Sequence, residues 1–174
     1  VHYSEEDTVN AFAFLGGHVV IYQGLIDRLE SENALAMVLA HEIAHVQHRD
    51  VAKSLGRGLA LSLVSSVILG NADGVAGTII NSGLHTGLLS FGRGQETDAD
   101  EAAIQAVYRL YGHTEGAFQL YQALQAEMEQ QGGLLQVEFL STHPLTENRI
   151  QNLQQLVEQR GWPQQGNLLP VPEF

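Results

Sequence analysis

Three histidines and a glutamate fall within eight residues of the segment LAHEIAHVQHRD, residues 39–50. His41 and His45 are four residues apart, and Glu42 directly follows the first of them. On an α-helix, residues four apart lie on one face, so both imidazoles would be directed at one point. Glu42 would lie about 100° further round the helix, where it could contact a water beside the metal. This His-Glu-x-x-His pattern predicts two nitrogen ligands for a metal ion and one general base.

A catalytic zinc also requires a third protein ligand and an open position. His48 lies on the same helix face, but about 10 Å along the axis from His41, which is too far on a straight helix. Glu96 and Asp100, in the segment ETDAD, are four residues apart at the expected start of another helix. One carboxylate could bind zinc while the other accepts the N–H of a ligating imidazole. We therefore favour Glu96, and His48 stays the alternative.

The composition limits what the chain can bind. Its 174 residues, 44% hydrophobic and 16% charged, are typical of one globular domain, here predicted to span residues 1–174. The formal net charge of −12 argues against nucleic acid and anionic membrane surfaces as partners. Because the chain has no cysteine, a metal must be bound by histidine, aspartate or glutamate.

The N-terminal sequence and the apolar runs bear on targeting. The opening VHYSEEDTVN lacks a methionine, a basic region and an apolar core, so we expect a trimmed domain whose targeting segment has been removed. The longest apolar run, residues 59–69, is 11 residues long, whereas a spanning helix needs about 20. The sequence therefore predicts no transmembrane span.

Residues 10–26 have the pattern of a β-hairpin. Phe12 and Phe14 alternate with small residues, and the segment HVVIY is β-branched and aromatic. Gly16 and Gly17 between them predict a two-residue turn.

The metal-binding helix should follow this hairpin. Ser31 is a suitable N-cap, and apolar residues recur at helical spacing after it. We expect the helix to continue to about Leu55, where Gly56 and Gly58 would end it.

The segment between this helix and Glu96 is unusually rich in glycine. Seven glycines fall between positions 70 and 94. We expect a helix, then a loop, then a short helix over residues 59–94. The loop is either a tolerated insertion or a mobile flap over a cleft.

Helical patterns return in the C-terminal half. One helix should begin at about residue 95 and end at Gly112, a second should run from Thr114 to about Gly132, and a third from Thr146 to Arg160. Several helices with one small sheet indicate an α+β fold, mostly helical, with a β-hairpin beside the metal-binding helix.

Taken together, these motifs resemble the M48 family of gluzincin metallopeptidases. The segments NAFAFLGG, HEIAHVQHRD, ETDAD and STHP, with Arg149 six residues after His143, occur in the order that the family shows. The resemblance covers roughly residues 10–160 and is greatest to the soluble, periplasmic quality-control branch of bacterial envelopes. The branch that contains the CAAX prenyl proteases shares the motifs but has transmembrane helices.

The resemblance implies a zincin-like fold and a set of roles. His41, His45 and Glu96 would bind one Zn²⁺ per chain, Glu42 would be the catalytic base, and Asp100 would orient a zinc-bound histidine. The implied activity is hydrolysis of peptide bonds in unfolded or misassembled envelope proteins, in the periplasm or cell envelope. The alternative is a latent or inactive zincin that binds peptides as a chaperone module.

The resemblance also places residues beyond the metal. His143 would lie near zinc, with Arg149 supporting it or the substrate. We expect His143 to have two possible states: a donor to the oxyanion, or a ligand that fills the open position and keeps the enzyme latent. A polypeptide would lie as an extended strand along a sheet edge formed by Asn10, Gly17, His18, Val19 and Val20.

Overall fold

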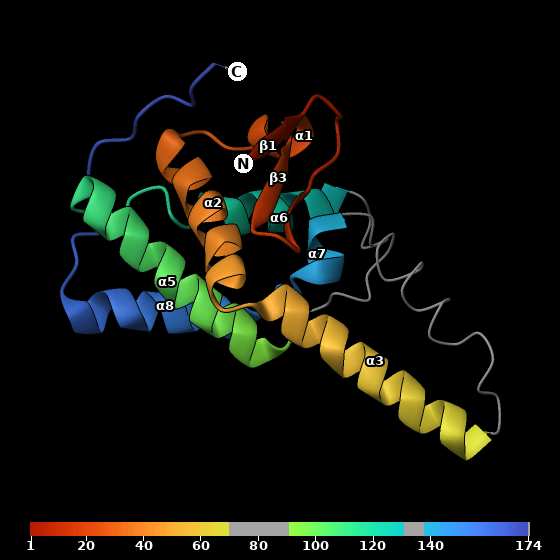
Figure 1. The fold of residues 1–174 in the computed structure, drawn as a ribbon. Coiled ribbons are helices and arrows are strands. Elements are labelled where there is room, and N and C mark those ends of the chain that lie inside the picture. The colour runs from red at the N-terminus through yellow and green to blue at the C-terminus, as the bar shows by residue number, and fades with distance from the viewer. Residues whose placement is uncertain (70–90, 131–137, 174) are drawn as a thin grey trace.

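The computed structural model describes residues 1–69, 91–130 and 138–173. Helices predominate there, and a small three-stranded sheet lies beside one of them (Figure 1). This confirms the predicted α+β class. The helices are α1 (Gln23–Ile26), α2 (Glu32–Gln47), α3 (Asp50–Leu69), α5 (Arg93–Tyr111), α6 (Gln119–Gln130), α7 (Glu138–Thr142) and α8 (Glu147–Arg160).

The predicted flap over residues 70–94 lies outside the described residues, except for residues 91–94. Among the described helices, none combines the length and hydropathy that a membrane span requires.

The sheet consists of β1 (His2–Ser4), β2 (Ala11–Phe14) and β3 (His18–Tyr22), in the order β1-β3-β2. The predicted hairpin is confirmed, with β2 antiparallel to β3 and Phe14 opposite His18. Gly16 and Gly17 both have positive φ, 93° and 82°, as their turn requires. The loop contains Leu15 as well, so the expected two-residue turn is one residue too short. Strand β1, parallel to β3, was not predicted from the sequence.

The sheet order corrects the expected substrate edge. His18, Val19 and Val20 belong to β3, which is the central strand and pairs on both sides. A peptide cannot add to a strand whose two edges are already paired. The edge strand next to β3 is β2, which begins directly after Asn10.

The metal-binding helix is shorter than predicted. Ser31 caps α2 as expected, its hydroxyl accepting a hydrogen bond from the Ala34 backbone N–H at 3.2 Å. However, α2 ends at Gln47, and Arg49 adopts a left-handed conformation with φ of 56°. A new helix, α3, starts at Asp50 and continues through Gly56 and Gly58. The glycines therefore lie inside a helix, where each is tolerated at a cost of about 1 kcal/mol.

Helix α5 packs along α2 more extensively than any other pair of elements does. It ends at Gly112, whose φ of 76° confirms the predicted helix end. A buried core joins α2, α5, α6 and α8 through Met37, Ala103, Ile104, Val107, Tyr121, Leu153 and Val157. This packing fixes the first turn of α5 against the middle of α2, where both predicted metal motifs lie.

Candidate active site

The HEIAH motif lies in the second half of α2, and its polar side chains are buried. His41, Glu42 and His45 expose 1%, 0% and 0% of their surface. The Nε2 atoms of His41 and His45 lie 3.1 Å apart, as a spacing of one helical turn predicts. Helix α2 thus directs two imidazole nitrogens at one point inside the protein.

Glu96 reaches the same point from the first turn of α5. Its Oε1 lies 3.3 Å from Nε2 of His45, and its Oε2 lies 3.5 Å from Nε2 of His41. The structure therefore brings together the three side chains that the sequence analysis selected as metal ligands.

His143, directly after α7, adds a fourth side chain to this group. Its Nδ1 lies 3.2 Å from Nε2 of His41 and 3.2 Å from Oε1 of Glu96. Ligand atoms of His41, His45, Glu96 and His143 all lie within 4.8 Å of one another. These side chains are close enough together for one metal ion to contact all four.

The outward-facing nitrogens show whether a cation fits this cluster. Nδ1 of His41 lies 3.0 Å from Oδ1 of Asp100, and Nδ1 of His45 lies 3.0 Å from Oδ2 of Asp50. Carboxylates accept hydrogen bonds, so both histidines carry their N–H on the outer nitrogen. With the outer nitrogens engaged in this way, the inner Nε2 atoms are the ones that can give a lone pair to a cation, in place of a proton. The residues therefore fit a metal.

The charges around the cluster also favour a cation. Burial lowers the pKa of His41, but Asp100 and Glu96 together raise it to about 10. Burial raises the pKa of Glu96, but hydrogen bonds from the three histidines hold it well below its usual range. The raised pKa of His41 reports a negative potential at its imidazole, and the lowered pKa of Glu96 shows that its charged carboxylate, a metal ligand type, is the stabilised form.

Arg149, on α8, connects the carboxylates behind the cluster. It donates from Nε and Nη2 to the two oxygens of Asp100, each at 2.7 Å, and its Nη1 lies 2.7 Å from Oε2 of Glu96. Nη1 also donates to the carbonyl of Pro144 at 3.0 Å, and Tyr121 donates its hydroxyl to Asp100 at 2.7 Å. Burial raises the pKa of Asp100, but Arg149 and then His41 outweigh it and lower the pKa.

Two aromatic rings cover the cluster. Phe91 stacks on His45 at a centroid distance of 4.0 Å, and Phe139 stacks on His143 at 4.5 Å. The backbone N–H of Phe91 donates to the carbonyl of Thr142 at 3.1 Å, which joins the start of α5 to the end of α7. Since Glu42 and all four candidate ligands are buried, the site is closed in this conformation.

Comparison with known families matches residues 1–157 to peptidase family M48. The chain is a member of the M48 peptidase family. This confirms the family that the motifs indicated.

Known relatives are named as a protease or a metalloendopeptidase. The β-barrel assembly-enhancing protease of Yersinia pestis is 33% identical over 156 residues, a match that covers 83% of this chain and 31% of that protein. The protein of the same name from Escherichia coli is 35% identical over 155 residues, with the same coverage. The mitochondrial metalloendopeptidase OMA1 of Schizosaccharomyces pombe is 31% identical over 156 residues, covering 89% of this chain and 45% of that protein. This M48 chain thus matches less than half the length of these relatives.

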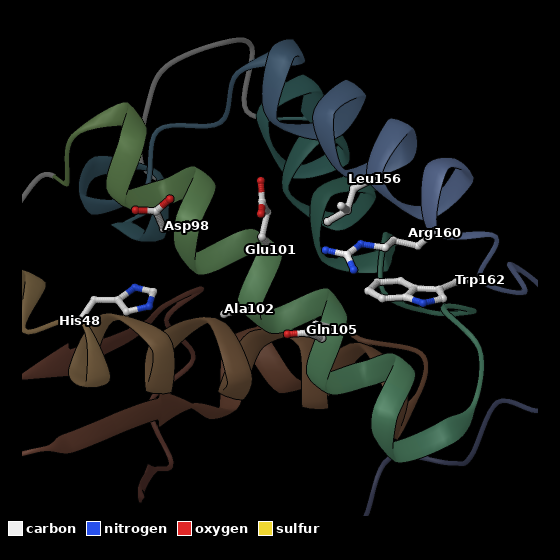
Figure 2. Close-up of a pocket in the computed structure, with 8 residues that line it drawn as sticks. All are labelled: His48, Asp98, Glu101, Ala102, Gln105, Leu156, Arg160 and Trp162. Atoms are coloured by element: carbon white, nitrogen blue, oxygen red, sulfur yellow. The ribbon is translucent and has the colours of Figure 1, made fainter.

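His48, the alternative third ligand, lies outside the cluster of His41, His45, Glu96 and His143. Its side chain is 37% exposed, and its Nδ1 is 3.9 Å from Asp50. Figure 2 shows it at one end of an outer groove of about 300 Å³. The groove is lined by His48, Asp98, Glu101, Ala102, Gln105, Leu156, Arg160 and Trp162. None of the clustered ligands lines this groove, so the structure gives no support to His48 as a ligand.

Several residues around the four candidate ligands were not identified from the sequence. Asp50 was not identified because one helix was expected to continue through it. Phe91, Phe139 and Tyr121 have no local pattern that separates them from ordinary core residues. Only their tertiary neighbours show that they contact the histidines or Asp100.

Replacing Arg149 with methionine should lower the free energy of unfolding by about 3–5 kcal/mol, because it leaves two buried carboxylates without their cation. Chemical denaturation followed by circular dichroism measures this change. Arg160→Met is the control on the same helix, since Arg160 is exposed and lies 6.0 Å over the Trp162 ring. It should cost no more than about 1 kcal/mol. Equal losses in both variants would contradict a special role for Arg149.

Proposed function

We propose that this chain is the catalytic domain of a zinc-dependent endopeptidase and that residues 1–174 form one domain. His41, His45 and Glu96 hold one zinc ion per chain. The observation that carries this proposal is the convergence of three side chains, whose ligand atoms lie 3.1–3.5 Å apart, with the outer nitrogen of each histidine facing a carboxylate.

The chain's own side chains supply the proton transfers. Zinc, when bound, provides Lewis acidity that polarises a carbonyl and activates a water near neutral pH. Glu42 accepts the proton of the attacking water on its carboxylate and donates it to the nitrogen of the leaving amine. Asp100 holds the tautomer of His41, and Arg149 positions Asp100 and Glu96. His143, once away from the ligand atoms, donates from Nε2 to the developing oxyanion.

The conformation described here supports a latent state as the second part of the proposal. Nδ1 of His143 lies 3.2 Å from ligand atoms of both His41 and Glu96, where it would take the position that a water or substrate needs on a bound metal. The same segment also lies against the substrate side of the sheet, because the Phe139 N–H donates to the Val9 carbonyl at 3.3 Å, next to Asn10. Displacement of α7 and His143 would free both the metal position and the edge of β2.

Replacing His143 with alanine should raise the rate of casein cleavage. If the open state is populated at about 10% or less in wild type, removing the His143 side chain should raise the cleavage rate roughly tenfold or more. The rise is smaller where the lost oxyanion donor also slows the reaction. Initial rates and zinc affinity are measured together, and affinity should fall because one ligand is lost.

His48→Ala is the matched control, since it removes an exposed histidine outside the cluster, and it should leave both quantities unchanged. A lower cleavage rate in His143→Ala with unchanged zinc affinity would mean that His143 acts only as a donor. Latency by His143 would then be wrong.

The substrate is proposed to be polypeptide bound as an extended strand along the edge of β2 that Asn10 begins. Pairing through the backbone reads little sequence, which suits unfolded or misassembled chains. The names of two relatives refer to β-barrel assembly, and such barrels belong to outer membranes. We therefore propose the bacterial periplasm or envelope as the location and envelope proteins as substrates.

Metal analysis combined with casein cleavage tests the function. One zinc per chain and cleavage that chelation abolishes would support the endopeptidase. Zinc without cleavage, in His143→Ala as well as in wild type, would favour a peptide-binding or chaperone module. A chain that binds no zinc would contradict both.

A further inference from the structure

Asp50 is a buried carboxylate that the roles above leave unassigned. It is the first residue of α3 and is 1% exposed. Its Oδ2 lies 3.0 Å from Nδ1 of His45, whose other nitrogen faces Glu96 and His41. Asp50 therefore contacts the outer nitrogen of His45, as Asp100 contacts the outer nitrogen of His41.

The backbone makes this contact possible by interrupting the helix. If α2 continued through position 50, Asp50 would lie about 140° round the axis from His45 and about 7.5 Å further along it. The carboxylate could not then reach the imidazole. Arg49 has φ of 56°, and among the described residues it is the one residue other than glycine with positive φ. This conformation is unfavourable for a residue with a Cβ atom, and it returns Asp50 to His45.

The burial of Asp50 needs a reason, because a buried carboxylate is unfavourable unless it is paired. Lys53 contacts Oδ1 at 3.3 Å, but its side chain is 59% exposed and largely in water. The Gln95 side chain also hydrogen-bonds the carboxylate but carries no charge. The ionisable partner that is itself fully buried is His45, at 0% exposure. The left-handed turn at Arg49 and the burial of the Asp50 carboxylate are both unfavourable, and both are explained by the contact of Asp50 with His45.

We propose that Asp50 is a positioning residue of the metal site and that the left-handed turn at Arg49 is the device that places it. Asp50 accepts the Nδ1–H of His45, which keeps the lone pair of Nε2 directed at the metal and increases its basicity. The inference rests on the proposed function, since it assigns a role within the same site.

Zinc affinity, measured by competition with a chromophoric chelator, tests the proposal. Asp50→Ala should weaken binding by about 10–100-fold. Asp50→Asn should weaken it less, because the amide oxygen still accepts the hydrogen bond but carries no charge. The visible absorption spectrum of the Co²⁺-substituted protein should change in Asp50→Ala, whereas a purely structural role would leave it as in wild type. If the alanine variant does not fold, the asparagine variant carries the test.

The turn is tested through Arg49. Arg49→Gly should keep wild-type zinc affinity, because glycine adopts positive φ readily. Arg49→Val should lose affinity as Asp50→Ala does, because a β-branched residue strongly disfavours this conformation. Equal affinities in the two variants would overturn the role of the turn.

Two controls separate the possible failures. Asp98→Asn removes one negative charge from the exposed side of α5, at the outer groove (Figure 2), and should not change affinity. His45→Ala should abolish tight binding. If Asp50→Asn and Asp50→Ala fold and bind zinc as wild type does, or no more weakly than Asp98→Asn, while His45→Ala does not bind, the inference is wrong and the proposed function stands. If His45→Ala binds as well as wild type, the proposed metal site itself is wrong.

Discussion

Replacing Glu42 with glutamine should preserve zinc binding and lower peptide hydrolysis by at least about 10²–10⁴-fold, the contribution of a positioned general base. The amide keeps the size of the side chain but cannot accept the proton of water. Glu42 is fully buried, and neither of its oxygens accepts a hydrogen bond from the described part of the chain. Its Oε1 lies 3.3 Å from Nε2 of His143, so it faces a side chain of the ligand cluster, as expected of a group positioned for proton transfer.

The loss is best measured in two backgrounds. Glu42→Gln is compared with the parent in wild type and in His143→Ala, since the closed conformation limits the wild-type rate. Glu101→Gln is the control, because Glu101 is an exposed glutamate on α5 (Figure 2). Residual activity within roughly tenfold of the parent, with full zinc content, would remove Glu42 from the role of general base.

The parts of the site that follow from local rules could be predicted from the sequence. The convergence of His41 and His45 depends only on helical periodicity, which the capped, regularly apolar α2 provides. The selection of Glu96 also rests on local reasoning, because its spacing from Asp100 places both carboxylates on one face of α5. In the structure Glu96 contacts both histidines and Asp100 contacts His41.

The interruption of the helix at Arg49 could not be predicted in this way. No glycine or proline marks the position, and the sequence continues with residues that form helices. The left-handed conformation accompanies a side-chain contact, that of Asp50 with His45, which helical periodicity does not anticipate. Periodicity therefore assigned one helix where there are two, and it placed the helix end at Gly56 and Gly58 instead.

The pairing of strands is another non-local property. The sequence pattern identified β2 and β3 as a hairpin, but it did not identify β1, the other neighbour of β3. Strand β1 is only three residues long and lacks a regular pattern. Because β1 and β2 flank β3, the central strand offers no free edge, and we propose β2 as the binding edge instead.

Replacing Glu96 with alanine should weaken zinc binding by more than about 100-fold, since even the partners behind the ligands contribute 10–100-fold. Hydrolysis should be lost with the metal. The fold should largely survive, because Arg149 keeps both of its hydrogen bonds to Asp100. Zinc content after dialysis, initial rates and the circular dichroism spectrum are measured on the same preparation.

Two further variants, Glu96→Gln and Glu101→Ala, serve as controls for Glu96→Ala. Glutamine keeps the volume and an acceptor for Arg149 but loses the charge, so it should bind zinc weakly while unfolding like wild type. Glu101→Ala removes an exposed carboxylate from the same helix and should change none of the three quantities. Full zinc and full turnover in Glu96→Ala would show that the third ligand is another residue. His143 would then be the next to test, because its Nδ1 lies 3.2 Å from Nε2 of His41, whereas His48 lies outside the cluster.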